Sequence, residues 1–290
     1  MRQWSRANAG DGLDEVTVVL VAPQFHDAAQ ALLGSTKVLL ADQGVAVVDC
    51  SVDELQAASL SELSSDVTLV VSFGGDGTFL KAAAAAHQAE IPVLGVNFGR
   101  LGYLLPIEPD QLWGVIARGI SQGFLLEDRC VLDVRLPDGT SFTAINELAL
   151  EKREPGHMLR LSTMVDDETF VTYAADGIVV ATPTGSTAYN LSAGGPVLDP
   201  TMHATIVTPV APHLAVDRSI VLPPGRMVTV VVDDDRGAVA VVDGRFVGAL
   251  APQQAVTVTT HRVPLRLVVD AGTDTFGRLR SILSPTDLRV

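Results

Sequence analysis

The sequence is poor in aromatic residues and lacks long apolar runs, and both shortages narrow the class of protein. Aromatic residues make up 5% of the 290 residues although 47% are hydrophobic, so the cores must consist of Val, Leu, Ile and Ala. The longest apolar stretches, such as Val16 to Ala22, are far shorter than the ~20 residues that cross a bilayer. No apolar segment typical of a secretory signal follows the N-terminus. We therefore predict a soluble, cytoplasmic protein with no membrane partner.

Basic residues and cysteines are also scarce. Lys and Arg number 20 against 34 Asp and Glu, which gives a formal net charge of −14. Proteins that bind nucleic acid need a positive surface, so this charge argues against DNA or RNA as a partner. The two cysteines, Cys50 and Cys130, have no neighbouring Cys or His, which predicts reduced, inert thiols and no metal site.

Residues 1–121 alternate strand-like and helix-like segments. After a polar tail at 1–14, which we expect to be frayed, the segments 16–22, 45–49, 67–73 and 91–97 have the composition of strands. The segments between and after them favour helices, namely 27–43, 54–63, the alanine-rich stretch after residue 78, and 111–120. This alternation predicts an α/β, Rossmann-like domain with a parallel sheet.

The pattern changes near Gln122, where hairpin signals replace helices. Strand pairs are expected at 130–136 with 141–150, at 159–165 with 169–174, and at 228–232 with 238–242. They predict a mainly antiparallel β domain over residues 122–268, with one short helix near 187–192. Residues 269–290 form a C-terminal segment, in which a helix over 274–283 is expected to pack back on the first domain.

The loop Gly74-Gly75-Asp76-Gly77-Thr78 follows the third strand and opens a helix. Its backbone N–H groups and the helix N-terminus suit a phosphate. A purely structural glycine turn would also fit this spacing, but the carboxylate of Asp76 would repel phosphate unless it orients a hydroxyl or holds a metal. The loop thus favours phosphoryl transfer.

Two further segments carry polar groups in apolar surroundings. Asn146 and Glu147 interrupt the apolar stretch from Phe142 to Leu150. Period-2 alternation turns one of the two side chains inward, where a buried polar group needs a partner. Two solvated residues at the end of a strand are the simpler alternative. From Asp176 to Pro196 a strand enters a loop of small hydroxyl residues and glycine, which suits a ribose or phosphate but also a plain capped helix.

Several other polar residues are weaker candidates. By composition alone, His157, His213 and the Asp243-Gly244-Arg245 turn are interpreted as ordinary loop residues. The run Asp233-Asp234-Asp235 is interpreted as a solvated turn and not as a metal site.

Taken in this order, these motifs resemble those of the NAD kinase family. The resemblance extends from Val16 to about Leu283, and it also includes Thr208-Pro209 through His213 and Asp243-Gly244. The segment from Thr182 to Pro196 is the most specific part, whereas lipid kinases and phosphofructokinases share the glycine–aspartate loop. The family implies a site in a cleft between an α/β and a β domain, and transfer of the γ-phosphoryl of ATP or another donor such as polyphosphate to the 2′-hydroxyl of the adenosine ribose of NAD.

The resemblance also assigns roles. Asp76 is implied as the catalytic proton acceptor; an ordinary Asp pKa of about 3.9 suits a residue that orients the hydroxyl. The implied binding residues are Gly74, Gly75, Gly77, Thr78, Lys81, Asn146, Glu147, His157, Asp176, Thr187, Ala188, Tyr189, Asn190, Leu191 and Ser192. The protein itself is expected to hold no metal, Mg²⁺ is expected with ATP, and a homodimer or homotetramer is expected.

Some residues depart from the family pattern, and two other functions remain open. Arg245 stands where relatives often have Gln, Ala174 occupies a position that is basic in some members, and Arg100 to Pro106, Ala211 and Leu214 also differ. These departures leave the preference for NAD or NADH and the phosphoryl donor unsettled. The alternatives are a kinase of another acceptor, such as a lipid, and a non-catalytic NAD(P)-binding paralogue.

Overall fold

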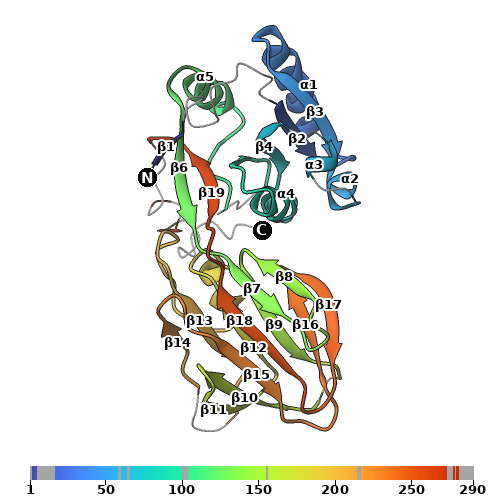
Figure 1. The fold of residues 1–290 in the computed structure, drawn as a ribbon, viewed down its shortest axis with the longest axis vertical. Helices are drawn as coiled ribbons and strands as arrows, with labels where there is room; N and C mark the ends of the chain where they lie inside the picture. Colours follow the sequence, from blue (N-terminus) through green and yellow to red (C-terminus); the bar gives the residue numbers. More distant parts are fainter. Residues whose placement is uncertain are drawn as a thin grey trace. The chain divides into compact units, whose positions relative to one another are not determined.

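A computed structural model describes most of the chain, which divides into two compact units (Figure 1). The described residues are 2–4, 17–57, 60–63, 66–99, 104–154, 156–213, 217–272, 277, 279 and 280. The first unit comprises residues 1–128 and 265–290, and the second comprises residues 129–264. The departures at 100–103 and 214 therefore lie outside the described residues, as does most of the helix expected at 274–283.

The first unit is built on a seven-stranded sheet with the strand order β1-β6-β19-β5-β4-β2-β3. The edge strand β3 pairs in parallel with β2, and β2, β4 and β5 also pair in parallel; β19 pairs in parallel with β5, and β1 pairs antiparallel with β6. The strands are β1 (Arg2–Trp4), β2 (Thr17–Ala22), β3 (Ala46–Ser51), β4 (Val67–Gly74), β5 (Val93–Asn97), β6 (Phe124–Arg129) and β19 (Leu265–Val269). Every residue of β2 is buried, as expected of a strand with helices on both faces.

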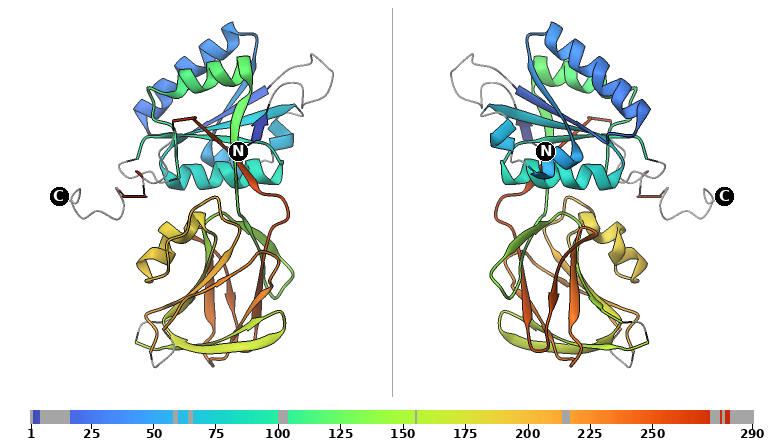
Figure 2. Two further views of the ribbon diagram at one scale, coloured as in Figure 1. Left: turned by 90° about the vertical axis from the view of Figure 1, so that its left-hand side faces the viewer. Right: turned by 90° about the vertical axis from the view of Figure 1, so that its right-hand side faces the viewer.

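Helices cover both faces of this sheet (Figure 2). On one face, α1 (Asp27–Asp42) and α5 (Leu112–Gln122) pack their apolar residues against β2, β4 and β5 in a single core. On the other face lies α4 (Asp76–Gln88), whose Phe79 leaves no room for a side chain at Gly95 in β5. The predicted α/β fold is thus confirmed.

Three details of the first unit differ from the prediction. The expected frayed tail contains β1, and the expected helix at 54–63 is two short helices, α2 (Val52–Ala57) and α3 (Leu60–Leu63). Residues 124–129 and 265–268 fall within the range predicted for the β domain, but they belong to β6 and β19 of the first sheet.

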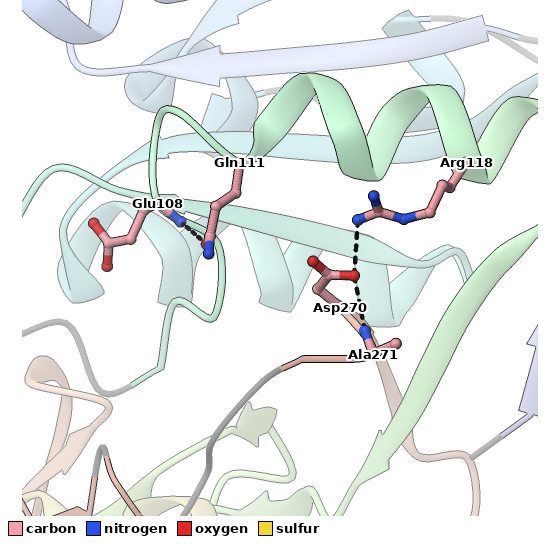
Figure 3. Close-up of polar contacts among 5 residues, drawn as sticks. All are labelled: Glu108, Gln111, Arg118, Asp270 and Ala271. Atoms are coloured by element: carbon pink, nitrogen blue, oxygen red, sulfur yellow. Dashed lines mark hydrogen bonds and ion pairs between the residues drawn. The ribbon is translucent and has the colours of Figure 1, made fainter.

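An ion pair connects the end of β19 to α5. The Arg118 guanidinium contacts the Asp270 carboxylate at 2.8 Å, and the same carboxylate accepts the N–H of Ala271 (Figure 3). Before α5 begins, the side chain of Gln111 accepts the N–H of Glu108. These contacts fix the returning chain to the first unit.

The second unit is an antiparallel β domain, as predicted, and its strands form a sandwich of two sheets. One has the order β11-β10-β15-β18-β7-β8 and the other β14-β13-β12-β9-β16-β17, and one core of mainly Val, Leu and Ala side chains from both fills the space between them. The strands are β7 (Leu132–Arg135), β8 (Ser141–Ala144), β9 (Glu147–Lys152), β10 (Leu159–Val165), β11 (Glu168–Ala175), β12 (Gly177–Ala181), β13 (Thr205–Val210), β14 (Ile220–Leu222), β15 (Val228–Val232), β16 (Ala238–Val242), β17 (Arg245–Leu250) and β18 (Ala255–Thr260).

One predicted strand pairing is wrong, and one predicted strand is divided. The single strand expected at 141–150 is two strands, β8 and β9, which belong to different sheets and are separated by a bend at Ile145 and Asn146. The expected hairpin of 228–232 with 238–242 does not form, because β15 pairs with β10 and β18 whereas β16 pairs with β9 and β17. Alternation along a strand shows which residues are buried but not which sheet buries them.

Candidate functional site

The glycine loop of the first unit lies at the carboxyl end of β4. The strand ends at Gly74, Gly75 precedes the first turn of α4, and Asp76 is the first residue of that helix. The N–H of Phe98, which follows the neighbouring strand β5, donates to the Gly74 carbonyl at 2.9 Å. No side chain caps α4 at Gly75. The N–H of Thr78 donates to the Gly75 carbonyl at 3.1 Å, which leaves the N–H groups of Asp76 and Gly77 in the first turn for an anion.

The three glycines of the loop are not equivalent. A Cβ at Gly74 would lie 2.8 Å from the Thr78 side chain, so the protein's own packing requires glycine there. A Cβ at Gly75 or Gly77 would meet nothing within 4 Å, and neither has a positive φ. Since the fold does not require glycine at these two positions, the open space beside them suits a bound group that approaches the backbone closely.

Charged and polar side chains flank this open space. Asp76 is half-buried in the first turn of α4, and the exposed Lys81 lies one helical turn beyond Gly77. The Ser72 hydroxyl of β4 is fully buried, and the described part of the chain offers it no hydrogen-bond partner. This end of the sheet therefore combines exposed backbone N–H groups with a carboxylate and an ammonium group.

In the second unit, Asn146 and Glu147 lie at the bend between β8 and β9. Each is only 7% exposed. The Glu147 carboxylate accepts the backbone N–H of Tyr189, but Asn146 Oδ1 and Glu147 Oε2 have no hydrogen-bond partner among the described residues. Buried polar oxygens without partners are costly, so both are suited to accept hydrogen bonds from a ligand.

The loop after β12 packs directly against this bend. The hydroxyl of Thr182 donates to the Ile145 carbonyl at 2.6 Å, and its N–H donates to the Asn146 carbonyl at 2.8 Å. A Cβ at Gly185 would lie 2.1 Å from the Asn146 carbonyl oxygen, so only glycine fits there. The 3₁₀ helix η2 (Thr184–Thr187) and the short helix α6 (Tyr189–Ser192) follow. The structure thus brings the bend and this predicted loop together.

Asn190 is a structural element of that loop. Its side chain is fully buried, and both amide hydrogens are donated internally, to the carbonyls of Ser186 and Pro196 at 3.0 Å. Its Oδ1 accepts the Thr208 hydroxyl at 2.7 Å. The more accessible residues of the loop are Thr187, Ala188, Tyr189, Leu191 and Ser192.

A set of charged groups lies beside the bend. Lys152 Nζ contacts Asp176 Oδ1 at 2.6 Å. Burial, the Glu151 carboxylate that accepts the Tyr189 hydroxyl, and the nearby charges of Asp176 and Glu147 raise the pKa of Tyr189 to about 12. Acidic groups therefore predominate here, which suits the hydroxyl and amino donors of a nucleoside better than phosphate.

Two protein-family models match this chain, one over the region of each site. The ATP-NAD kinase N-terminal domain matches residues 15–124, and the ATP-NAD kinase C-terminal domain matches residues 145–269. An NAD kinase of Heliobacterium modesticaldum is 40% identical over 216 residues, which are 73% of this chain and 76% of that protein. The chain belongs to the ATP-NAD kinase family.

Solved structures of NAD kinase relatives share the fold. A yeast NADH kinase complexed with NADH superimposes with a TM-score of 0.82 at 24% identity, covering 95% of this chain and 88% of that one. An NAD kinase from Archaeoglobus fulgidus in complex with ATP has a TM-score of 0.74 at 25% identity, covering 92% and 99% respectively. The expected resemblance is therefore confirmed, and this member of the NAD kinase family is a kinase.

The remaining predicted residues of this NAD kinase family member lie in exposed positions. His157 is exposed in the turn between β9 and β10. His213 is also exposed, and its N–H donates to the Ala174 carbonyl of β11 at 2.7 Å. Within the described residues, no group of three or more His, Cys, Asp or Glu side chains is placed to hold a metal ion, and no helix is both long and apolar enough to cross a membrane.

Sequence reasoning missed Glu151 and Lys152 as members of the second-unit site. Glu151 lies four residues after Glu147 on β9, so strand alternation places both on the same face and could have revealed it. The pairing of Lys152 with Asp176 depends on the register of β9 against β12, for which the sequence has no local signal.

Glu147 gives the stability of this protein an expected pH dependence. Burial, and next the negative charge of Asp243, raise its pKa to about 8 from an ordinary 4.5, although the Tyr189 N–H opposes this. The folded protein then keeps a proton that the unfolded chain releases, so this contribution is complete below pH 4.5 and is lost as the pH rises through 8. The free energy of unfolding should fall by about 1 kcal/mol per pH unit in this window.

Glu147→Gln should flatten that slope, as measured by urea denaturation between pH 5 and 8. The matched control is Glu168→Gln, because Glu168 is exposed at the start of β11; this variant should keep the wild-type slope. An unchanged slope in Glu147→Gln would show that Glu147 does not hold the proton.

Proposed function

We propose that this chain transfers the γ-phosphoryl of ATP, or of another donor such as polyphosphate, to the 2′-hydroxyl of the adenosine ribose of NAD and so produces NADP. The observation that carries the proposal is membership of the ATP-NAD kinase family across both units. The chemistry of the two sites supports it, because one is suited to phosphate and the other to a nucleoside.

In this proposal the first unit handles the phosphoryl group. In the loop of Gly74, Gly75, Gly77 and Thr78, the N–H groups at Gly75 and Gly77, with Lys81 nearby, bind phosphate oxygens, and the open space beside these two glycines supports this role. Asp76 accepts a hydrogen bond from the ribose 2′-hydroxyl, orients it for attack and takes its proton as the new bond forms. A loose phosphoryl-transfer transition state needs such positioning more than a strong base.

Mg²⁺ fits this loop as an ion carried by the donor. The half-buried carboxylate of Asp76 would repel a nearby phosphate, and an Mg²⁺ ion bound to the donor phosphates and water would offset that repulsion. When bound, the ion would neutralise phosphate charge.

The second unit recognises the dinucleotide in this proposal. Asn146 and Glu147 form hydrogen bonds with the adenosine through oxygens that have no partner among the described residues. Asp176, His157 and the accessible loop residues 187–189, 191 and 192 complete the contacts, whereas Asn190 keeps the loop in shape.

The decisive experiment is an activity matrix with purified protein. ATP, GTP and polyphosphate are each tested as donor with NAD and NADH as acceptors, and formation of NADP or NADPH is followed by chromatography. NADP from NAD with MgATP is the expected result. Absence of either product with every donor would refute the proposal, and a thermal shift with NADP but no turnover would indicate a binding paralogue.

We further propose a cytoplasmic homodimer or homotetramer. Both cysteines are free thiols, which suits a reducing compartment. The edge strands β11 and β17 expose Phe170 and Phe246, which could pair across copies. Light scattering that gives a monomer mass, or cell fractionation that places the protein elsewhere, would refute these two statements.

A further inference from the structure

Asp243 lies in the two-residue turn that joins β16 to β17. Val242 and Arg245 pair across the hairpin, and Asp243 and Gly244 between them have positive φ values of 47° and 76°. Such a turn favours Asn-Gly or Asp-Gly, so the local backbone explains the residue type only in part, because Asn would serve the turn equally well.

The carboxylate of Asp243 binds the bend that carries Asn146 and Glu147. Oδ2 accepts the N–H of Ile145 at 2.8 Å, and Oδ1 accepts the N–H groups of Asn146 and Glu147 at 2.7 and 3.1 Å. The N–H of Asp243 donates in return to the Glu147 carbonyl at 3.0 Å. One side chain therefore satisfies three consecutive backbone donors at the point where the chain leaves one sheet for the other.

Residues of the loop after β12 contact the opposite side of the bend. Thr182 binds the carbonyls of Ile145 and Asn146, and Gly185 packs against the latter. The backbone of 145–147 is thus held between the Asp243 turn and the loop after β12. Two buried side-chain oxygens of the bend, Asn146 Oδ1 and Glu147 Oε2, have no hydrogen-bond partner in the described part of the chain.

We propose that Asp243 is a positioning residue for dinucleotide binding, which holds the 145–147 backbone so that the Asn146 and Glu147 side chains meet the adenosine. The proposal rests on the proposed function, since it takes the ligand of those two side chains to be NAD. Asp243 itself is placed to contact the protein backbone and not the ligand. Its charge also helps to keep a proton on Glu147, whose pKa it raises.

The test is Asp243→Asn. Because Asn-Gly suits the same turn, the hairpin should persist, but the amide NH₂ must face a backbone N–H that the carboxylate accepted. The Kd and KM for NAD should rise by about tenfold or more, whereas the KM for ATP should stay within about twofold. The pH at which Glu147 titrates should also fall, because a negative neighbour is lost.

The matched control is Asp138→Asn. Asp138 is also followed by glycine in a hairpin connection, between β7 and β8, and accepts the N–H of Thr140 at 2.9 Å, but it is exposed. This control should bind NAD as the wild type does. Asp243→Gly, which also suits the turn, is the second variant and should lose NAD affinity to a similar extent.

Calorimetric binding of NAD separates this proposal from the proposed function. If the wild type makes no NADP, the function fails, yet the affinities of wild type and variants still decide the role of Asp243. The proposal is overturned by wild-type NAD affinity in a folded variant, by equal changes in the constants for NAD and ATP, or by failure of both variants to fold, which would make Asp243 a folding residue.

Discussion

Asp76→Asn should lower kcat by about 10²–10⁴-fold while the Kd for NAD changes little. The amide has almost the same shape as the carboxylate, so the first turn of α4 and the glycine loop should stay in place. The Asn amide cannot accept the proton of the hydroxyl. It also orients the 2′-hydroxyl poorly, because its NH₂ group donates and only its oxygen accepts a hydrogen bond. The loss should therefore appear in the chemical step, measured by single-turnover formation of NADP with saturating NAD and MgATP.

The matched control for this variant is Asp27→Asn. Asp27 is the first residue of α1, as Asp76 is of α4, so both changes remove a negative charge from a helix N-terminus. Asp27→Asn should keep the wild-type kcat. If both variants lost activity equally, the effect would come from helix stability, and the catalytic assignment of Asp76 would be wrong.

Gly75→Ala should abolish most activity without destabilising the protein. The added methyl would meet no atom within 4 Å and the backbone φ is −95°, so the free energy of unfolding should change by less than about 0.5 kcal/mol. The same methyl would occupy the space in which a phosphate approaches the backbone. We expect the KM for ATP to rise by about tenfold or more, measured by steady-state kinetics beside thermal unfolding.

Gly74→Ala is the companion variant that separates packing from ligand binding. Its Cβ would lie 2.8 Å from the Thr78 side chain, so overpacking should cost about 1–3 kcal/mol of stability. A stable Gly75→Ala variant with wild-type kinetics for ATP would contradict the assignment of phosphate to this loop. A destabilised one would mean that the fold needs glycine there after all.

The sequence was most informative where structure and chemistry are local. The strand, glycine loop and helix from Val67 to Gln88 follow each other without interruption, so apolar periodicity and glycine spacing were sufficient to place them. One of Asn146 and Glu147 was expected to point inward from a single continuous strand, whereas both are buried. Their setting at a bend between two sheets depends on Thr182, Gly185 and Asp243, the last of which lies 97 residues from Asn146.

By itself, then, the sequence determined the family resemblance, the order of an α/β and a β portion, and the glycine loop with Asp76. Only the tertiary structure decided that Asp243 binds the Asn146 bend, that Lys152 pairs with Asp176, and that β15 and β16 belong to different sheets. The physical reason is that periodicity records which side of a segment is buried, a property of near neighbours. Which distant strand supplies the covering surface is settled by packing two whole sheets face to face.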